Sequence, residues 1–376
     1  MKILRLQLQK FMTFDDLNVE WSPNINVISG ENGSGKTTIL KAMYSALKPL
    51  QPSDSAWRKL DASTTKKERF EQTLAERFED KFCGVFRPDG RRIGRLASRT
   101  TGRVKTKVEL GLSLDGKTKG GVEIRFTSGQ ANGVDAKRKG FEVAPGFDTI
   151  YLPSKEMIST TESFAALYEN FDIAFEETYY DLAKALALPL RKGPNTGKQK
   201  SVLNKIVEIL PGEGKATVTQ RQGRFYLKAP GEGEYEMGLL AEGYRKIATL
   251  YYLVANGALN ENSVLFWDEP EVNLHPRLIR PTVAALVELA RLGAQIFVST
   301  HNYFVQQEFN FAAVYPPPKK KNVKIRFYSL YKDDAKTTQI AEADRVSELE
   351  PNAIMEEFDE LYRREVMEID RRAGDL

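Results

Sequence analysis

Residues 30–37 read Gly-Glu-Asn-Gly-Ser-Gly-Lys-Thr, and the apolar-rich run Ile25-Asn26-Val27-Ile28 leads into them. A glycine followed after four residues by Gly-Lys-Thr is the spacing of a phosphate-binding loop, the P-loop. Its glycines let backbone N–H groups turn toward phosphate oxygens, its lysine reaches the β- and γ-phosphates, and its threonine hydroxyl binds Mg²⁺. A helix pattern follows, and its N-terminal dipole adds positive potential. We predict that a nucleotide is contacted by Gly30, Asn32, Gly33, Ser34, Gly35, Lys36, Thr37 and Thr38.

The composition excludes several classes of protein. Hydrophobic residues make up 41% and charged residues 28% of the 376 residues, as in ordinary globular proteins. No run of about 18 apolar residues occurs and the N-terminal residues alternate like a strand, so we expect neither a membrane span nor a signal peptide. The single cysteine, Cys83, excludes an internal disulfide and fits a cytoplasmic location. Two histidines and one cysteine are too few for a Cys/His zinc site.

A second motif follows a predicted buried strand, in the sequence Ser-Val-Leu-Phe-Trp-Asp-Glu-Pro at residues 263–270. Four consecutive apolar residues are typical of a parallel strand that is covered on both faces. Asp268, at the carboxyl end of this strand, is expected to complete the Mg²⁺ site begun by Thr37. Glu269 is the natural general base for a water that attacks the γ-phosphate. The alternative interpretation is an ordinary acidic turn.

A third predicted strand, Gln-Ile-Phe-Val-Ser at residues 295–299, is followed by Thr300 and His301. Ligands of open α/β sheets bind at the carboxyl ends of strands, which is where this histidine lies. There, His301 could donate a hydrogen bond to the γ-phosphate and respond to its loss. The alternative is a histidine with a structural role.

Together these segments resemble the ATPase heads of ABC type, in the branch of SMC, RecF and OLD-like proteins rather than transporters. The features are Ile3-x-x-Leu6-x-Leu8-x-x-Phe11 followed by Phe14, the segment Asp-Glu-Pro-Glu-Val-Asn-Leu-His-Pro at 268–276, and the histidine after the third strand. The resemblance covers residues 1–50 and about 235–310 well and the middle poorly. It implies an α/β P-loop NTPase fold with mixed parallel and antiparallel sheets and a helical subdomain. No a/d heptad register is sustained, so we expect no long coiled coil.

The resemblance also implies that two heads close around two ATP molecules, each head offering a signature helix to the other's P-loop. The candidate signature residues are Ala241, Glu242, Gly243 and Arg245. Ala241 stands where the family has a serine, and losing a hydrogen bond to a charged group costs ~1.5–3 kcal/mol. We therefore expect slow ATP hydrolysis. The sequence offers no convincing residue for the family's glutamine loop.

We divide the chain into four segments. Residues 1–60 form an N-terminal lobe with the P-loop, and 61–234 form an inserted β-rich, basic and helical region. Residues 235–310 carry the signature helix and the second and third motifs, and 311–376 form a strand and an acidic helix. The apolar positions Ile354, Phe358, Leu361 and Ile369 of this last helix have helical spacing, so one of its sides must pack on its own head or on another subunit.

The middle region is basic. Between Arg87 and Gly140 there are 14 basic and 5 acidic residues. Residues 106–114 and 121–126 alternate as strands that could continue an antiparallel sheet, joined at the turn signal Asp115-Gly116. The basic residues either contact nucleic acid or form the solvated face of this sheet.

Two helical predictions complete the middle region. Residues 66–86 are expected to form a helix and then a strand. Residues 164–188 are expected to be helical, with aromatic residues on one face. That aromatic face either forms the core of a small lid or docks a partner.

Our first hypothesis is a homodimeric ATP-dependent switch, with higher assemblies left open, that controls a separate effector in bacterial anti-phage defence. OLD-like relatives carry a nuclease domain that needs a glutamate and a D-x-D cluster. No D-x-D follows His301, so we expect the nuclease to be a separate protein. The alternative is a RecF-like ATPase of DNA repair that binds DNA. A transporter ATPase is a weaker third option.

Overall fold

The P-loop lies at the carboxyl edge of a six-stranded sheet with the order β14-β13-β3-β12-β11-β7. This computed structural model describes residues 1–51, 66–99, 102–113, 119–140, 146–191, 197–318 and 320–374. All pairings in the sheet are parallel except that of β13 with β14. The strands are β3 (Ile25–Gly30), β7 (Asp148–Leu152), β11 (Ser263–Asp268), β12 (Gln295–Ser299), β13 (Ile325–Lys332) and β14 (Thr338–Ala343).

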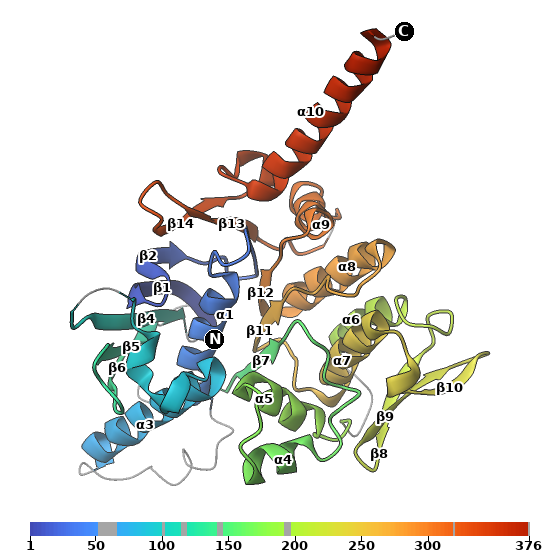
Figure 1. Cartoon of the computed structure of the whole chain (residues 1–376). Helices are drawn as coiled ribbons and strands as arrows, with labels where there is room; N and C mark the ends of the chain where they lie inside the picture. Colours follow the sequence, from blue (N-terminus) through green and yellow to red (C-terminus); the bar gives the residue numbers. More distant parts are fainter. Residues whose placement is uncertain are drawn as a thin grey trace.

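A five-stranded antiparallel sheet, β2-β1-β4-β5-β6, faces the parallel one (Figure 1). It joins the N-terminal strands to the strands of the basic middle region, which confirms the expected mixture of sheets. Its strands are β1 (Lys2–Phe11), β2 (Phe14–Glu20), β4 (Lys105–Ser113), β5 (Lys119–Thr127) and β6 (Asp135–Lys139). The Asp115-Gly116 turn and the predicted segment boundary at residue 60 lie outside the described residues.

Helix α1 (Lys36–Leu47) begins at the P-loop and is buried between the two sheets. Alternate residues of the parallel strands serve two cores, since successive side chains of a strand point to opposite faces. Val264 and Phe266 pack in the core with α1, whereas Leu265 and Trp267 pack in the core on the other face. The continuous apolar run of β11 is thus explained by burial on both faces.

Helices cover the other face of the parallel sheet, and a small antiparallel sheet, β10-β9-β8, lies beside them (Figure 1). The helices are α5 (Glu177–Leu186), α6 (Gly197–Val207), α7 (Glu242–Asn256), α8 (Pro276–Leu292) and α9 (Tyr303–Val314). The strands are β8 (Thr217–Arg221), β9 (Arg224–Ala229) and β10 (Gly233–Glu236). The described residues contain no long coiled coil, as expected.

Two local predictions need correction. Residues 66–86 were expected to form a helix and then a strand, but the strand is absent because α3 (Lys66–Phe86) is a single helix over the whole range. Phe82 and Phe86 lie one turn apart and both pack edge-on against Phe11, which makes the helical spacing favourable. The aromatic segment 164–188 is divided into α4 (Phe164–Asn170) and α5, and Phe171 between them is 64% exposed.

Strands from different predicted segments pair with one another in the same sheet. Strand β7, from segment 61–234, pairs with β11, and β13, from segment 311–376, pairs with β3.

The last helix, α10 (Ala353–Gly374), projects from the body of the molecule (Figure 1). None of the described helices combines the length and the apolar character needed to cross a membrane.

Candidate nucleotide-binding site

Two glycines of the P-loop adopt conformations that other residues rarely adopt. Gly30 has φ +142° and Gly35 has φ +101°. A Cβ atom on Gly30 would lie 2.4 Å from the carbonyl oxygen of Leu330, and one on Gly35 would lie 2.5 Å from the ring of Phe14. Helix α1 has no side-chain cap and no acidic residue in its first turn. Its first N–H groups are therefore available to an anion.

The side chain of Lys36 folds back over the P-loop. Its Nζ donates to the carbonyl oxygens of Gly30 (2.7 Å) and Glu31 (2.9 Å). Burial lowers the pKa of Lys36, although nearby carboxylates oppose this shift. The hydroxyl of Ser34 is buried and has no hydrogen-bond partner among the described residues. A buried lysine and an unpaired hydroxyl in one loop fit a phosphate group.

Three more P-loop residues were predicted to contact the nucleotide. Asn32 and Gly33 are exposed at the crest of the loop, and Thr38 is half-buried in the first turn of α1. Their contacts with a nucleotide stay predictions.

Thr37 and Asp268, the two predicted Mg²⁺ ligands, are in contact. Thr37 Oγ1 lies 3.0 Å from both carboxylate oxygens of Asp268. Ser299 also donates to Asp268, and Tyr151 of β7 donates to it over 3.4 Å. Burial raises the pKa of Asp268, while the hydrogen bonds from Ser299 and Thr37 lower it. Hydroxyl and carboxylate oxygens are ligands that Mg²⁺ prefers, so these residues fit the implied metal.

Glu269 and His301 are also brought together. His301 Nδ1 lies 3.1 Å from Glu269 Oε1, and the two follow adjacent strands β11 and β12. Glu269 has φ +48°, a rare conformation for a residue with a side chain. Its N–H donates to the Ser299 carbonyl oxygen over 3.1 Å, which holds this backbone in place. Such backbone strain is common at functional sites.

Glu271 supports this arrangement, although no role was predicted for it. Its Oε1 accepts hydrogen bonds from Thr300 Oγ1 (2.6 Å) and from the N–H of His301 (3.2 Å). Burial raises the pKa of Glu271. Its place in the Asp-Glu-Pro-Glu motif was the only available signal, and that signal did not reveal its partners.

The candidate signature segment begins α7. Ala241 is the exposed N-cap residue and provides no side-chain cap. Gly243 is buried, and a Cβ there would lie 2.9 Å from the carbonyl oxygen of Asn273. Lys246 donates to the carbonyl oxygen of Val272 over 2.7 Å, and burial lowers its pKa. The start of α7 is therefore packed against the turn that follows Glu269.

Arg245 is engaged within its own chain. Its guanidinium donates to Glu156 Oε1 (2.6 Å) and to Ser159 Oγ (3.0 Å). This ion pair ties α7 to the loop after β7. The expected contact of Arg245 with the nucleotide of another subunit stays a prediction.

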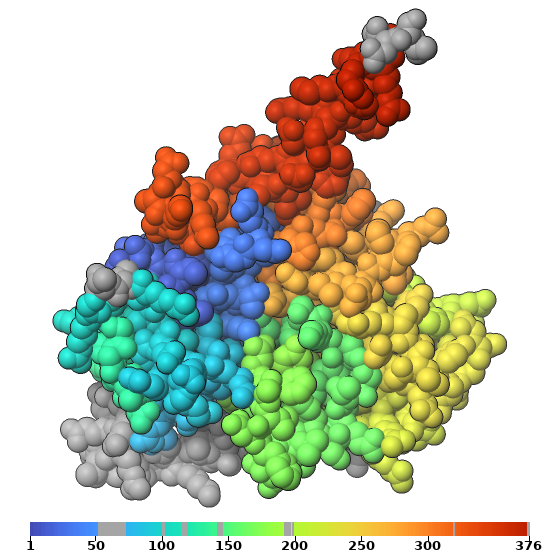
Figure 2. Space-filling model, viewed as in Figure 1, coloured from blue at the N-terminus to red at the C-terminus, as the bar shows by residue number. Residues whose placement is uncertain are grey.

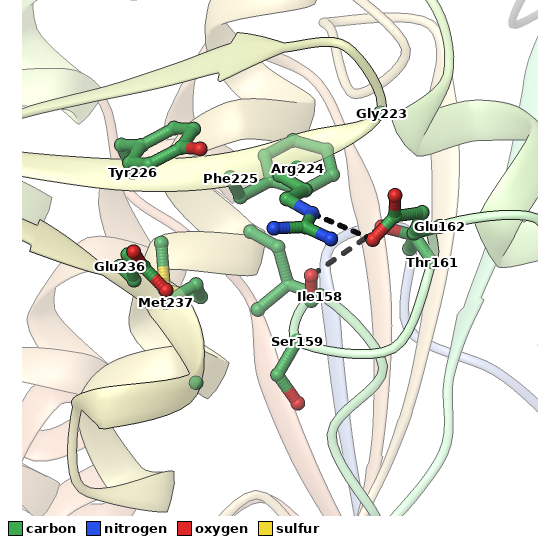
Figure 3. Close-up of a pocket in the computed structure, with 11 residues that line it drawn as sticks. Ile158, Ser159, Thr161, Glu162, Gly223, Arg224, Phe225, Tyr226, Glu236 and Met237 are labelled. Atoms are coloured by element: carbon green, nitrogen blue, oxygen red, sulfur yellow. Dashed lines mark hydrogen bonds and ion pairs between the residues drawn. The ribbon is translucent and has the colours of Figure 1, made fainter.

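A hollow of about 220 Å³ adjoins the segment that leads into α7 (Figure 3). It lies between the loop at 158–162, the β8–β9 hairpin and residues 236–238. Arg224 donates to Glu162 across it over 2.7 Å. None of the predicted nucleotide-contacting residues lines this hollow.

Acidic neighbours offset several of the basic residues on the antiparallel sheet. Lys107 is paired with Glu109 at 3.1 Å, and Lys139 with Glu123 at 3.1 Å. Arg125 is also paired with Glu123, at 2.9 Å. These pairs support the interpretation of this surface as a solvated sheet face, and nucleic-acid binding stays a prediction.

Comparison with known proteins extends the resemblance. Residues 25–305 match a protein family described as "AAA domain, putative AbiEii toxin, Type IV TA system". A 44-residue stretch is 50% identical to the DNA replication and repair protein RecF of Halalkalibacterium halodurans, covering 12% of each chain. A 42-residue stretch is 48% identical to the structural maintenance of chromosomes protein 6A of Arabidopsis thaliana, covering 11% of this chain and 4% of that one. The matches therefore span a small part of the curated relatives.

Two solved structures share the fold. One is an Smc head bound to the C-winged helix domain of ScpA, with a TM-score of 0.52, 12% identity, and coverage of 91% of this chain and 98% of that one. The other, derived from Pyrococcus furiosus, is an Smc head with an extended coiled coil bound to the C-terminal domain of ScpA. Its TM-score is 0.53 at 11% identity, with coverage of 96% of this chain and 99% of that one. The fold is that of an SMC head, as the sequence predicted.

Proposed function

Because the chain belongs to the AAA-domain family described as the putative AbiEii toxin of a type IV TA system, we propose that it binds and slowly hydrolyses ATP between two copies of itself. The observation that carries this proposal is the contact of Thr37 with Asp268 beside the pair of Glu269 and His301. Mg²⁺, when bound, would neutralise charge on the phosphates.

Each residue of the cluster has a proposed role. Lys36 exchanges its contacts with loop carbonyls for phosphate oxygens. Thr37 and Asp268 hold the metal, and Ser299 orients the carboxylate of Asp268. Glu269 accepts the proton of the attacking water, and His301 holds Glu269 in position.

The proposal of a composite site rests on the start of α7. Ala241 is exposed and leaves the first N–H groups of the helix without a side-chain cap. A γ-phosphate held by a second copy would satisfy them. The missing hydroxyl at Ala241 weakens that contact, which supports slow turnover.

The contacts of α7 also support a switch. Gly243 and Lys246 pack on the turn at 272–274, which follows the proposed base Glu269. A structural change beside the γ-phosphate would therefore shift the start of α7, which is the surface that a second copy contacts. We propose that the two states of this dimer control a separate effector, a nuclease, in anti-phage defence. The toxin–antitoxin description of the family supports such a role.

The test is the Glu269→Gln variant. This variant should bind ATP, fail to hydrolyse it, and form a larger assembly on size exclusion with ATP and Mg²⁺ than it forms with ADP. A variant whose size is the same with both nucleotides would refute the ATP-driven dimer.

A second candidate is a RecF-like DNA-binding ATPase, which the 44-residue match to RecF favours. DNA binding through the antiparallel sheet would fall steeply with salt. Exposed Arg103 and Arg125 lie on that sheet or at its edge, so Arg103→Ala with Arg125→Ala should reduce duplex binding. Absence of duplex binding at low salt would dismiss this candidate.

A further inference from the structure

Helix α10 is attached to the body only near its start. It has 22 residues, which corresponds to a length of about 33 Å. Asn352, just before the helix, exchanges hydrogen bonds with Gln306 of α9, and the ring of Phe358 stacks on Tyr303 with 3.9 Å between centroids. The remainder of the helix projects away from the rest of the described chain (Figures 1 and 2).

Helix α10 carries an exposed apolar stripe. Its members recur every three or four residues and therefore share one face of the helix. They are Phe358 (42% exposed), Leu361 (53%), Tyr362 (67%), Val366 (37%) and Ile369 (60%). Met367 is also 67% exposed but lies on the other side of the helix. A continuous stripe of this kind is characteristic of a helix that packs against a partner.

The charges along α10 are distributed unevenly. Four of the five residues at 356–360 are acidic, whereas all four arginines of the helix lie at 363–372, together with Glu365, Glu368 and Asp370. Glu357 and Arg364 lie on the same flank of the stripe, since their side chains approach to 3.5 Å across two turns. Asp359 and Arg363 lie on the opposite flank.

We infer that α10 pairs with α10 of a second copy in antiparallel orientation, with the two stripes in contact and the crossing near Leu361. In this arrangement Glu357 lies beside the partner's Arg364, and Asp359 lies beside the partner's Arg363. The twofold symmetry forms each pair twice. A parallel arrangement would instead place the acidic segment 356–360 against the same segment of the partner, and flanking charges set the orientation of paired helices.

This interface goes beyond the proposed function, because α10 contains none of the P-loop or α7 residues. It holds two copies together whether or not nucleotide is bound. A dimer closed through nucleotide and a dimer joined through α10 can coexist, which would link dimers into larger assemblies.

The test uses the full chain with the Lys36→Ala substitution and no nucleotide, so that the nucleotide pocket cannot join two copies. Light scattering should give twice the mass of one chain. Adding Leu361→Ser and Tyr362→Ser should halve that mass, whereas the matched control Met367→Ser should leave it unchanged. A monomeric Lys36→Ala protein, or a dimer that survives the stripe substitutions, would overturn the inference. A monomeric Lys36→Ala protein is also the result expected if α10 binds a different protein instead of a second copy.

Charge exchange tests the orientation. Glu357→Arg with Asp359→Arg makes the centre of α10 basic, and Arg363→Glu with Arg364→Glu makes it acidic. These residues are exposed, so both proteins should fold. Each alone should be monomeric, and a mixture of the two should regain the dimer mass. A quadruple variant with all four changes should dimerise by itself, and failure to do so would rule out the antiparallel pairing.

Discussion

Thr37 Oγ1 lies 3.0 Å from both carboxylate oxygens of Asp268, although 231 residues separate them in sequence. The contact exists because β3, which precedes the P-loop, and β11, which ends at Asp268, both pair with β12. Parallel strands place their carboxyl ends at one edge of the sheet. Three short motifs, each recognisable in the sequence, thus meet at one place.

Lys36→Ala should lower ATP affinity by on the order of 100-fold, because the charged hydrogen bonds to phosphate are lost. Equilibrium binding of a fluorescent ATP analogue measures this. The control is Lys10→Ala, since the side chain of Lys10 is 43% exposed and its ion pair with Asp15 contributes little. Equal affinity of the two variants would contradict the phosphate assignment.

Ser299→Ala should reduce ATP turnover about tenfold while leaving ATP affinity nearly unchanged, because Asp268 loses a hydrogen bond of ~1.5–3 kcal/mol. Steady-state ATPase rates and a binding titration separate the two effects. Ser45→Ala is the matched control, since the buried hydroxyl of Ser45 has no hydrogen-bond partner among the described residues. Full activity in Ser299→Ala would exclude its positioning role.

Ala241→Ser should raise ATP turnover about tenfold by restoring a hydroxyl at the start of α7. Ala241 is exposed, so the added oxygen meets no steric obstacle. The exposed Ala131→Ser serves as the control. An unchanged rate in Ala241→Ser would mean that the alanine does not limit hydrolysis.

Lys2 provides a test of pH dependence. Burial, with a smaller contribution from Lys321, lowers the pKa of Lys2 from 10.5 to about 8 in the folded protein. Between these two values the unfolded chain binds more protons, so the free energy of unfolding rises with pH. The rise amounts to about 3 kcal/mol at most. Denaturant titrations from pH 8 to 10.5 measure the free energy of unfolding. Lys2→Met should remove its rise with pH. A variant with the same pH dependence as the original protein would show that folding does not lower the pKa of Lys2.

The sequence could predict the parts of the site that depend on local pattern. The strand before the P-loop, the strand that ends at Asp268 and the helix of the signature segment are all indicated by short runs of residues. The apolar spacing of α10 was also readable from the sequence.

Other parts depend on which strands are neighbours, and a single sequence does not contain that information. Ser299 reaches Asp268 because β12 lies beside β11, and Tyr151 reaches it because β7 lies on the other side. Glu271 is identified as a support only by its contacts with Thr300 and His301. The prediction of a strand near residue 86 was wrong because the packing of Phe82 and Phe86 on Phe11 favours continuation of the helix.

The composite site is tested most directly by mixing two inactive proteins. Lys36→Ala disables the P-loop, and Ala241→Glu places a negative charge where the γ-phosphate of the other copy would lie. In a mixed dimer, one site combines both defects and the other has neither. Because half of the dimers in an equal mixture are mixed, ATPase activity should return to roughly a quarter of the wild-type value. A mixture as inactive as its two components would contradict the shared site.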